Sequence, residues 1–231
     1  MKKLWQRCLR YLLYIFIIQI VYIVALKWIM PPFTFTQLST LFSTGIQRDY
    51  VDWNEISYQV KLAAIASEDQ AFLDHWGVDW EATQKSLFPT KKKKKIIRGG
   101  GASTISQQTA KNVFLWQGNG FMRYVRKIPE FIYTWLIEII WGKQRILEIY
   151  LNVIEMGNGV YGIEAAAQKY FHKSAQKLSA TQAAQIIACL PNPKKFSVVP
   201  MSKRVGWRYP KILNQMRLIS SEPTLQNFLK N

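Results

Sequence analysis

The sequence predicts a mainly α-helical domain that follows a single N-terminal transmembrane helix. The prediction rests on an apolar run near the N-terminus, on apolar residues at helical spacing along the remainder, and on Gly, Pro and capping residues at the segment ends. The chain has 231 residues, of which 49% are hydrophobic and 19% charged. This size and composition fit one compact domain plus an anchor, and they argue against disorder.

The apolar run covers residues 9–30, and roughly 20 apolar residues are enough to span a bilayer. Its N-terminal side is basic, with Lys2, Lys3, Arg7 and Arg10. Because basic flanks stay in the cytoplasm, we expect residues 1–8 to be a cytoplasmic tail and 9–30 the transmembrane helix. A cleaved signal peptide is the alternative interpretation, but the run is long for one and no A-x-A-like site follows it.

The net charge of +17 favours anionic partners, which include nucleic acid, acidic lipid and phosphorylated substrates. With the N-terminus in the cytoplasm, everything after Pro31 is extracytoplasmic, so nucleic acid is not an expected partner. Cys8 and Cys189 would then lie on opposite sides of the membrane and could not form an intramolecular disulfide.

After a connector at 31–52, the rest of the chain, 53–231, shows a succession of helical patterns. The first begins at Ser57 and is ended by Gly77, and the others are predicted from capping residues, Gly and Pro at 79–87, from 103 or 104 onward, at 128–141, 143–156, 162–170 and 179–190. Between them, Lys91 through Lys95 read either as a solvated loop or as a segment attracted to anionic lipid headgroups.

The residues that could carry chemistry are mainly carboxylates. Two histidines and two scattered cysteines cannot build a usual zinc site, and no Gly-rich P-loop is present. An S-x-x-K match at 174–177 lacks its companion motifs and is attributed to chance. Only 14 acidic residues exist, and the candidates in apolar helical contexts are Glu68, Asp69, Glu130, Glu148 and Glu155. The alternative for each is a solvated or salt-bridged surface acid.

Five segments, in order, resemble the signatures of family 51 glycosyltransferases, the transglycosylase family of peptidoglycan synthesis. They are EDQAFLDHWG at 68–77, GASTISQQ at 101–108 with KN at 111–112, RKIPE at 126–130, ILEIYLN at 146–152 and ACLPNP at 188–193. The chain ends soon afterwards without a transpeptidase domain, so it resembles the monofunctional biosynthetic members rather than the bifunctional penicillin-binding proteins.

The resemblance implies a lysozyme-like, two-lobed helical fold around a cleft, at the bacterial inner membrane with the catalytic domain in the periplasm. It implies polymerisation of lipid II into glycan strands, with release of polyprenyl diphosphate and inversion at the anomeric carbon. Glu68 would be the general base, and Glu130 the second catalytic carboxylate, near the donor and leaving group. Lys111 would hold the pyrophosphate, with or without a divalent cation such as Mg²⁺ or Mn²⁺, and no organic cofactor is implied.

The remaining site residues implied by the resemblance would bind substrate or support the motifs. They are Asp69, Phe72, His75, Ser103, Thr104, Gln107, Gln108, Asn112, Arg123, Arg126 and Lys127. Glu148 and Asn152 are interpreted as structural. The family often has an arginine eight residues before the third-motif glutamate, where this chain has Met122, so we assign that role to the neighbouring Arg123.

Two other functions are considered. A lysozyme-like hydrolase would share the fold class and the paired carboxylates, but it would not need a membrane anchor or a pyrophosphate-binding lysine. A non-catalytic scaffold that binds other cell-wall synthesis proteins would tolerate loss of both glutamates. The expected partners of a polymerase are lipid II, the growing strand and membrane lipid, with other cell-wall synthesis proteins also compatible.

Overall fold

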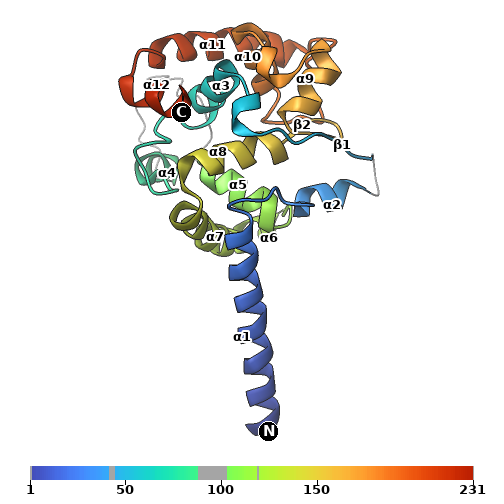
Figure 1. Ribbon diagram of the computed structural model, residues 1–231, viewed down its shortest axis with the longest axis vertical. Helices are drawn as coiled ribbons and strands as arrows, with labels where there is room; N and C mark the ends of the chain where they lie inside the picture. Colours follow the sequence, from blue (N-terminus) through green and yellow to red (C-terminus); the bar gives the residue numbers. More distant parts are fainter. Residues whose placement is uncertain (1, 42–44, 88–102, 119, 231) are drawn as a thin grey trace.

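The computed structural model describes residues 2–41, 45–87, 103–118 and 120–230, and these residues confirm the predicted mainly α-helical fold. The elements, in chain order, are α1 (Lys2–Ala25), α2 (Phe35–Leu41), β1 (Gln47–Arg48), η1 (Trp53–Glu55), α3 (Tyr58–Glu68), α4 (Trp80–Leu87), α5 (Ile105–Phe114), α6 (Phe121–Val125), α7 (Lys127–Ile140), α8 (Gly142–Val153), β2 (Glu155–Gly157), β3 (Val160–Tyr161), α9 (Ile163–Phe171), η2 (Ala175–Lys177), α10 (Ala180–Ala188), α11 (Lys203–Ile219) and α12 (Pro223–Lys230). Figure 1 shows α1 projecting as a stalk from a globular body that the other elements form.

Helix α1 begins and ends earlier than the transmembrane span predicted at 9–30, and the residues at its C-terminal end are part of the domain. Ile23 and Leu26 are buried in the core, and the chain turns after Ala25. The indole Nε1 of Trp141 donates to the Ile23 carbonyl at 2.7 Å. The guanidinium of Arg145 donates to the carbonyls of Leu26 and Ile29 at 3.1 and 2.8 Å. The end of the stalk is therefore hydrogen-bonded to α8 and the end of α7.

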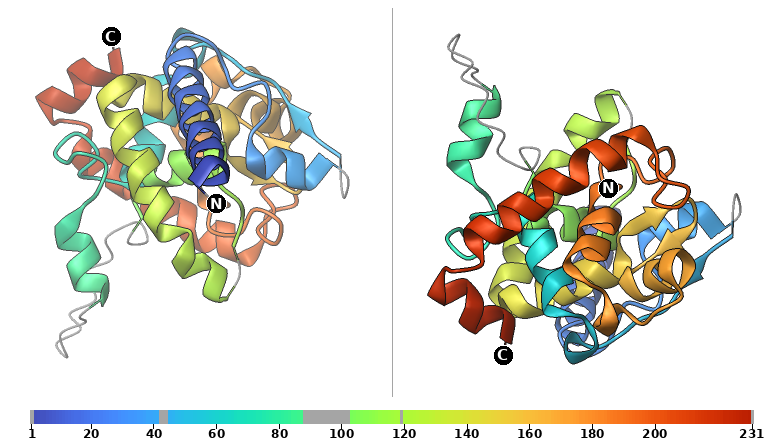
Figure 2. Two further views of the ribbon diagram at one scale, coloured as in Figure 1. Left: turned by 90° about the horizontal axis from the view of Figure 1, so that it is seen from below. Right: turned by 90° about the horizontal axis from the view of Figure 1, so that it is seen from above.

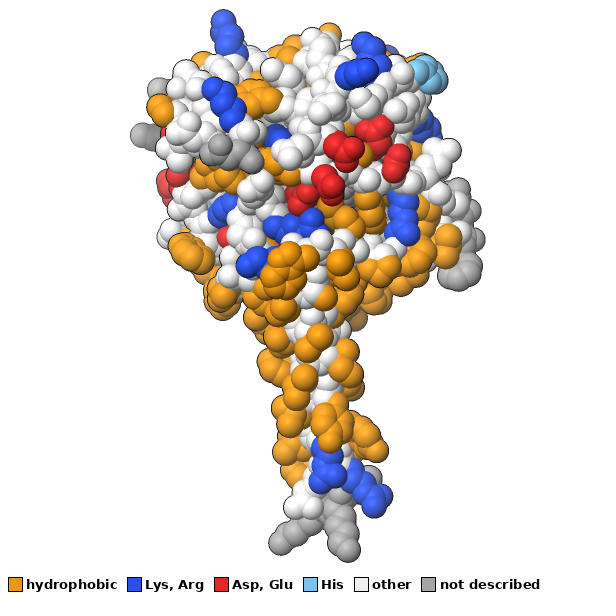
Figure 3. All heavy atoms as spheres, in the orientation of Figure 1, with side chains coloured by type: hydrophobic (Ala, Val, Ile, Leu, Met, Phe, Trp, Pro, Cys, Tyr) orange, Lys and Arg blue, Asp and Glu red, His pale blue; other side chains and the backbone are white. Residues whose placement is uncertain are grey.

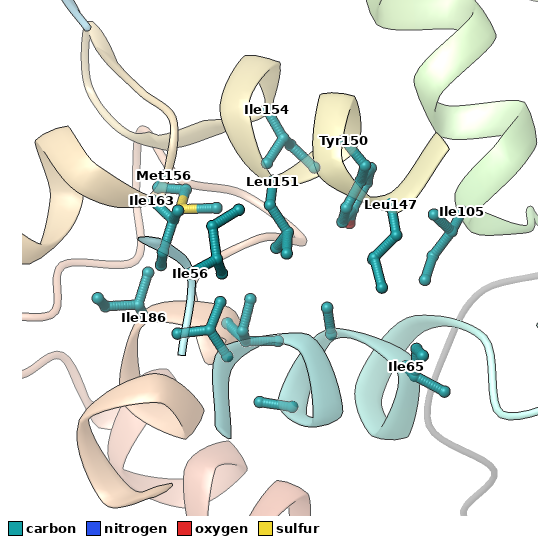
Figure 4. Packing of buried hydrophobic residues seen from close by; sticks show 14 of the residues in the cluster. Ile56, Ile65, Ile105, Leu147, Tyr150, Leu151, Ile154, Met156, Ile163 and Ile186 are labelled. Atoms are coloured by element: carbon teal, nitrogen blue, oxygen red, sulfur yellow. The ribbon is translucent and has the colours of Figure 1, made fainter. Parts of the chain in front are cut away.

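The core lies between α3 and the helices packed around it. Residues 60–67 of α3 are all buried, four of them are small, and α10, α11 and α12 pack against this helix. Figure 4 shows Ile65 of α3 facing Leu147 and Tyr150 of α8, with Ile105 of α5 beside them. This packing places the C-terminal end of α3 against the N-terminal half of α5.

Residues 31–52, predicted as a connector, contribute structure to the domain. Helix α2 buries Thr36, Gln37 and Thr40, and β1 pairs in parallel with β3 in a small sheet of order β1-β3-β2. In β1, the amide of Gln47 donates to the Gly159 carbonyl at 2.8 Å. Sequence periodicity detects a helix by its buried apolar stripe. Helix α2 buries polar residues instead, and the prediction of a connector here was therefore wrong.

Several predicted helix ends are confirmed. Capping boxes begin α5 at Thr104 and α10 at Ser179, and Gly142, with φ of 77°, marks the boundary between α7 and α8 as the first residue of α8. The first helix was predicted to extend to Gly77, but it ends at Glu68, where Asp69 leaves the helical conformation. Glu155 was placed in a helix and lies instead in β2.

Lys61 of α3 is buried beneath the Trp53 ring, with its Nζ 3.7 Å from the ring centroid. Burial lowers the pKa of Lys61 from 10.5 to about 8, although the charge of Glu148 opposes this shift. Below pH 8 the lysine is charged in both states, so the full cost of burying the charge applies. Between pH 8 and 10.5 only the unfolded chain keeps the proton, and this group's contribution to stability becomes more favourable as pH rises.

We therefore expect Lys61→Met to raise the Tm at pH 7 by at least about 2–4 °C, the change that roughly 1 kcal/mol makes in a domain of this size. The gain over the unsubstituted protein should shrink as pH approaches 10. Thermal melts of the detergent-solubilised chain at pH 7 and 10 measure it, with the exposed Lys173→Met as control. Absence of a gain at pH 7 would mean that the Trp53 ring offsets the burial cost.

Candidate active site

A cavity of about 250 Å³ lies between α5, the segment that follows it, and the start of α7. Its lining is strongly cationic, with four basic side chains and one carboxylate. The lining residues are Ser103, Gln107, Gln108, Lys111, Gln117, Gly118, Arg123, Arg126, Lys127 and Glu130. Such a lining favours an anionic ligand with more than one negative charge.

Glu130 is the carboxylate of this cavity, and it is buried in the first turn of α7. Its Oε1 lies 2.5 Å from Lys127 Nζ, and its Oε2 lies 3.4 Å from Arg126 Nε. Arg126 is also buried, and its Nη1 donates to the Trp116 carbonyl at 3.0 Å. Glu130 therefore holds two of the cations in place, and the negative charge at a helix N-terminus is itself favourable.

Lys111 lies one turn after Gln107 and Gln108 on α5, so all three side chains reach the same cavity. Burial lowers the pKa of Lys111, and the charges of Arg126, Lys127 and Arg123 lower it further, while Glu130 opposes them. A bound anion would reverse this effect by stabilising the protonated amine. The cluster is thus electrostatically uncompensated until an anion binds.

Glu68 is the last residue of α3, and it lies beside the cavity rather than in its lining. Its Oε2 accepts from Gln108 Nε2 at 3.2 Å, and Gln108 lines the cavity. Its Oε1 accepts from Ser67 Oγ at 3.0 Å and from Arg208 Nη2 at 2.9 Å. A single glutamine side chain therefore connects the carboxylate of α3 to the cationic cavity.

Asp69 joins the end of α3 to the start of α5. Its carboxylate contacts His75 Nε2 at 3.0 and 3.1 Å and accepts from the Ile105 amide at 3.0 Å. Thr104 caps α5 and donates its hydroxyl to the Gly77 carbonyl at 2.5 Å. Together these bonds fix the position of Glu68 relative to Gln108 and Lys111.

Comparison with known proteins identifies the family of this chain. Residues 35–217 match the model of the family described as Transglycosylase. The chain belongs to the transglycosylase family. Over 178 residues it is 49% identical to proteins named biosynthetic peptidoglycan transglycosylase from Escherichia coli (strain Crooks) and Shigella sonnei (strain Ss046), an alignment that covers 77% of this chain and 72% of each relative. Membership of the family predicted from the five motifs is confirmed.

The transglycosylase domain brings most of the predicted cationic and amide residues together. Ser103, Gln107, Gln108, Lys111, Arg123, Arg126, Lys127 and Glu130 all line the cavity. Arg123, which was assigned in place of Met122, is among them, whereas Met122 is not. Residues 91–95, 101 and 102 lie outside the described residues.

Other residues predicted to contact substrate are instead buried or hydrogen-bonded to other parts of the protein. Phe72 is fully buried, edge-on to Phe228 and to His75, so its prediction as a substrate contact is corrected to a core role. Asn112 is buried and accepts from Gln117 Nε2 at 3.3 Å, and it does not line the cavity. Asp69, His75 and Thr104 form the junction between α3 and α5 instead of lining the cavity.

The structure supports the structural interpretation of Glu148 and Asn152, which tie α8 to residues 51–53. The amide of Trp53 donates to Glu148 Oε1 at 2.7 Å, and Asn152 exchanges two bonds of 2.9 Å with the backbone of Val51. Sequence reasoning missed Gln117 and Arg208. Neither lies in a recognised motif, and Arg208 lies 140 residues from its partner Glu68.

The chemistry of the lining residues does not suit a protein-held divalent cation. Among the described residues, no group of three or more His, Cys, Asp or Glu side chains could hold a metal ion. The single carboxylate in the cavity is already shared by two cations. The lining instead offers ammonium and guanidinium groups, which bind phosphate oxygens directly.

Proposed function

We propose that this chain polymerises lipid II at the cavity between α5 and α7, with Glu68 as general base. The observation that carries the proposal is the connection of Glu68, through Gln108, to a cavity lined by four cations. The cations suit the pyrophosphate of a polyprenyl-linked donor, which carries negative charge before the reaction and gains more as it leaves. The neighbouring carboxylate suits the acceptor hydroxyl.

In the proposed reaction, the acceptor's sugar hydroxyl attacks the anomeric carbon of the donor from the side opposite the pyrophosphate. The new glycosidic bond forms, the bond between the anomeric carbon and the pyrophosphate oxygen breaks, and the configuration inverts. Glu68 takes the hydroxyl proton, and the leaving diphosphate keeps the electron pair. Lys111, Arg123, Arg126 and Lys127 stabilise that charge without needing to move.

Incubation of the purified chain with lipid II, and separately with finished glycan strands, tests this proposal. Chain growth from lipid II with release of polyprenyl diphosphate is expected, together with no cleavage of finished glycan. Cleavage without growth would indicate the hydrolase instead.

We further propose that α1 anchors the domain in the inner membrane, with the N-terminus in the cytoplasm and the domain in the periplasm. Residues 5–25 are long and apolar enough to cross a membrane, and Arg7 and Arg10 lie at their N-terminal side. The burial of Ile23 and Leu26 in the core supports an uncleaved anchor, since removal of α1 would expose apolar surface. A reporter fused after Asn231 should be active only if it functions outside the cytoplasm.

The underside of the body, around the stalk, is apolar in Figure 3. Along α7, Ile128, Ile132, Trp135 and Ile139 form an exposed stripe at helical spacing. Helix α2 exposes Phe35, Leu38 and Leu41 while it buries polar residues, which is the reverse of a helix on a water-facing surface. This apolar surface suits contact with the interfacial region of the bilayer.

The double substitution Ile128→Gln and Ile139→Gln should lower polymerisation in liposomes severalfold and leave it nearly unchanged in detergent micelles. The reason is that the stripe would position the cavity at the bilayer surface without contacting substrate. Leu218→Gln is the control, because Leu218 is also an exposed apolar residue but lies on α11, at the far end of the body. Equal losses in liposomes and micelles would contradict a membrane role for the stripe.

A further inference from the structure

Arg208 of α11 contacts the carboxylate on which the proposed reaction depends. Its Nη2 lies 2.9 Å from Glu68 Oε1 and 2.8 Å from Ser67 Oγ, and Ser67 Oγ in turn donates to the same carboxylate oxygen at 3.0 Å. These three groups form a closed triangle of hydrogen bonds. The triangle occupies Oε1, which leaves Oε2, held by one bond from Gln108, as the oxygen with a free lone pair.

The pair is largely shielded from water, since the Glu68 and Arg208 side chains are 9% and 13% exposed. A carboxyl group in such surroundings favours its protonated form unless a cation lies beside it. A protonated Glu68 could not accept a proton from the acceptor. A positive charge beside Glu68 therefore favours the carboxylate form that a general base requires.

Among the residues that the structure describes, Arg208 is the cation that forms an ion pair with Glu68. Among the described residues, further ionisable groups near Glu68 include its neighbour Asp69, Tyr150 of α8 and Cys189 at the end of α10. Burial raises the pKa of Tyr150 well above 10 and that of Cys189 to about 12, so both are neutral in the working range. Asp69 is bound to His75 and to the Ile105 amide.

Helix α11 is firmly placed for this role. It packs against α3 and α10, as Figure 2 shows from above, and it buries Val205, Ile212 and Met216. A second contact, between Gln70 Nε2 and Gln215 Oε1 at 3.0 Å, joins α11 to the turn after Glu68. The guanidinium is therefore held by the fold and does not depend on substrate to reach Glu68.

We propose that Arg208 is a positioning residue for Glu68: it places a positive charge beside the carboxylate, occupies Oε1, and thereby selects Oε2 as the atom that receives the acceptor proton. The proposal rests on Glu68 acting as the general base. Arg208 does not line the cavity proposed for the donor. Its effect on the reaction is exerted wholly through Glu68.

The test is the pH dependence of kcat for Arg208→Gln and Arg208→Lys with lipid II in detergent. Loss of an adjacent cation shifts a carboxylate's titration by about 1–3 pH units, so the acidic limb of the Arg208→Gln profile should move upward by that amount. The loss in kcat should be largest at low pH and should shrink as pH rises. Arg208→Lys should keep the limb near its original position, because the charge is retained.

Arg217→Gln is the matched control, since Arg217 is an exposed arginine of the same helix that bonds to Asn214. It should leave both kcat and the pH profile unchanged. A loss in Arg208→Gln that is the same at every pH, with a lowered Tm, would mean that Arg208 only supports packing and would overturn the proposal. An unchanged kcat at every pH would overturn it as well.

The variant Glu68→Gln tests the general-base role of Glu68 separately from the positioning role of Arg208. If Glu68→Gln is inactive while Arg208→Gln retains the original profile, the positioning role fails and the general base remains. If Glu68→Gln is active, both fail together.

Discussion

Replacing Glu68 with Gln should reduce polymerisation of lipid II by about 10²–10⁴-fold, the usual contribution of a general base. Glutamine keeps the size of the side chain and its carbonyl oxygen can still accept from Arg208, so the junction between α3 and α11 should persist. What it loses is the ability to take a proton from the acceptor. Continuous measurement of lipid II consumption, together with a thermal melt, would check both statements.

Asp74→Asn is the matched control for this substitution. Asp74 is an exposed acid in the turn that follows α3, six residues from Glu68, and it does not line the cavity. Its replacement should leave turnover close to that of the unsubstituted chain. Comparable activity in Glu68→Gln and Asp74→Asn would remove Glu68 from the mechanism.

The second large effect is expected at Lys111. Removal of one preorganised group that stabilises developing charge costs about 10²–10³-fold in kcat, and Lys111→Ala should fall in this range. Lys111→Arg should retain more activity, because a cation remains next to the leaving diphosphate. Inorganic pyrophosphate should inhibit the unsubstituted chain and Lys111→Arg more strongly than Lys111→Ala.

The exposed Lys173 provides the control for loss of a positive charge, since Lys173→Ala should change neither turnover nor inhibition. Equal turnover in Lys111→Ala and Lys111→Arg would show that the residue acts through packing rather than charge.

Much of the fold could be predicted because its signals are local. Ser179 with Gln182, Thr104 before α5 and Gly142 between α7 and α8 each act within one helix turn, and all three were placed correctly. Helix α2 was missed because its buried residues are polar. The orientation of α2 is set by contacts with elements far away in sequence, such as the bond from Thr36 to the Asn112 carbonyl of α5, and by the pairing of the following β1 with β3. A local sequence pattern carries no information about such contacts.

The candidate site was predictable where a motif carried it and not elsewhere. The motifs gave Lys111, Arg126 and Lys127 of the cavity, but they could not separate side chains that face it from side chains that support it. Phe72 and Asn112 are examples, because both lie next to site residues in sequence and point into the protein. Arg208 could not be found from sequence, since its pairing with Glu68 exists only once α11 has packed on α3.

Trp141 hydrogen-bonds to the end of α1 and Arg145 to the turn that follows it, so the domain is joined rigidly to the stalk rather than by a flexible linker. Transmembrane helices adapt to the thickness of the bilayer by tilting. With α1 in the membrane, as proposed, a change in its tilt would rotate the whole domain and alter how the mouth of the cavity meets the lipid surface. Bilayer thickness would then set the angle at which the enzyme receives its lipid-linked substrate.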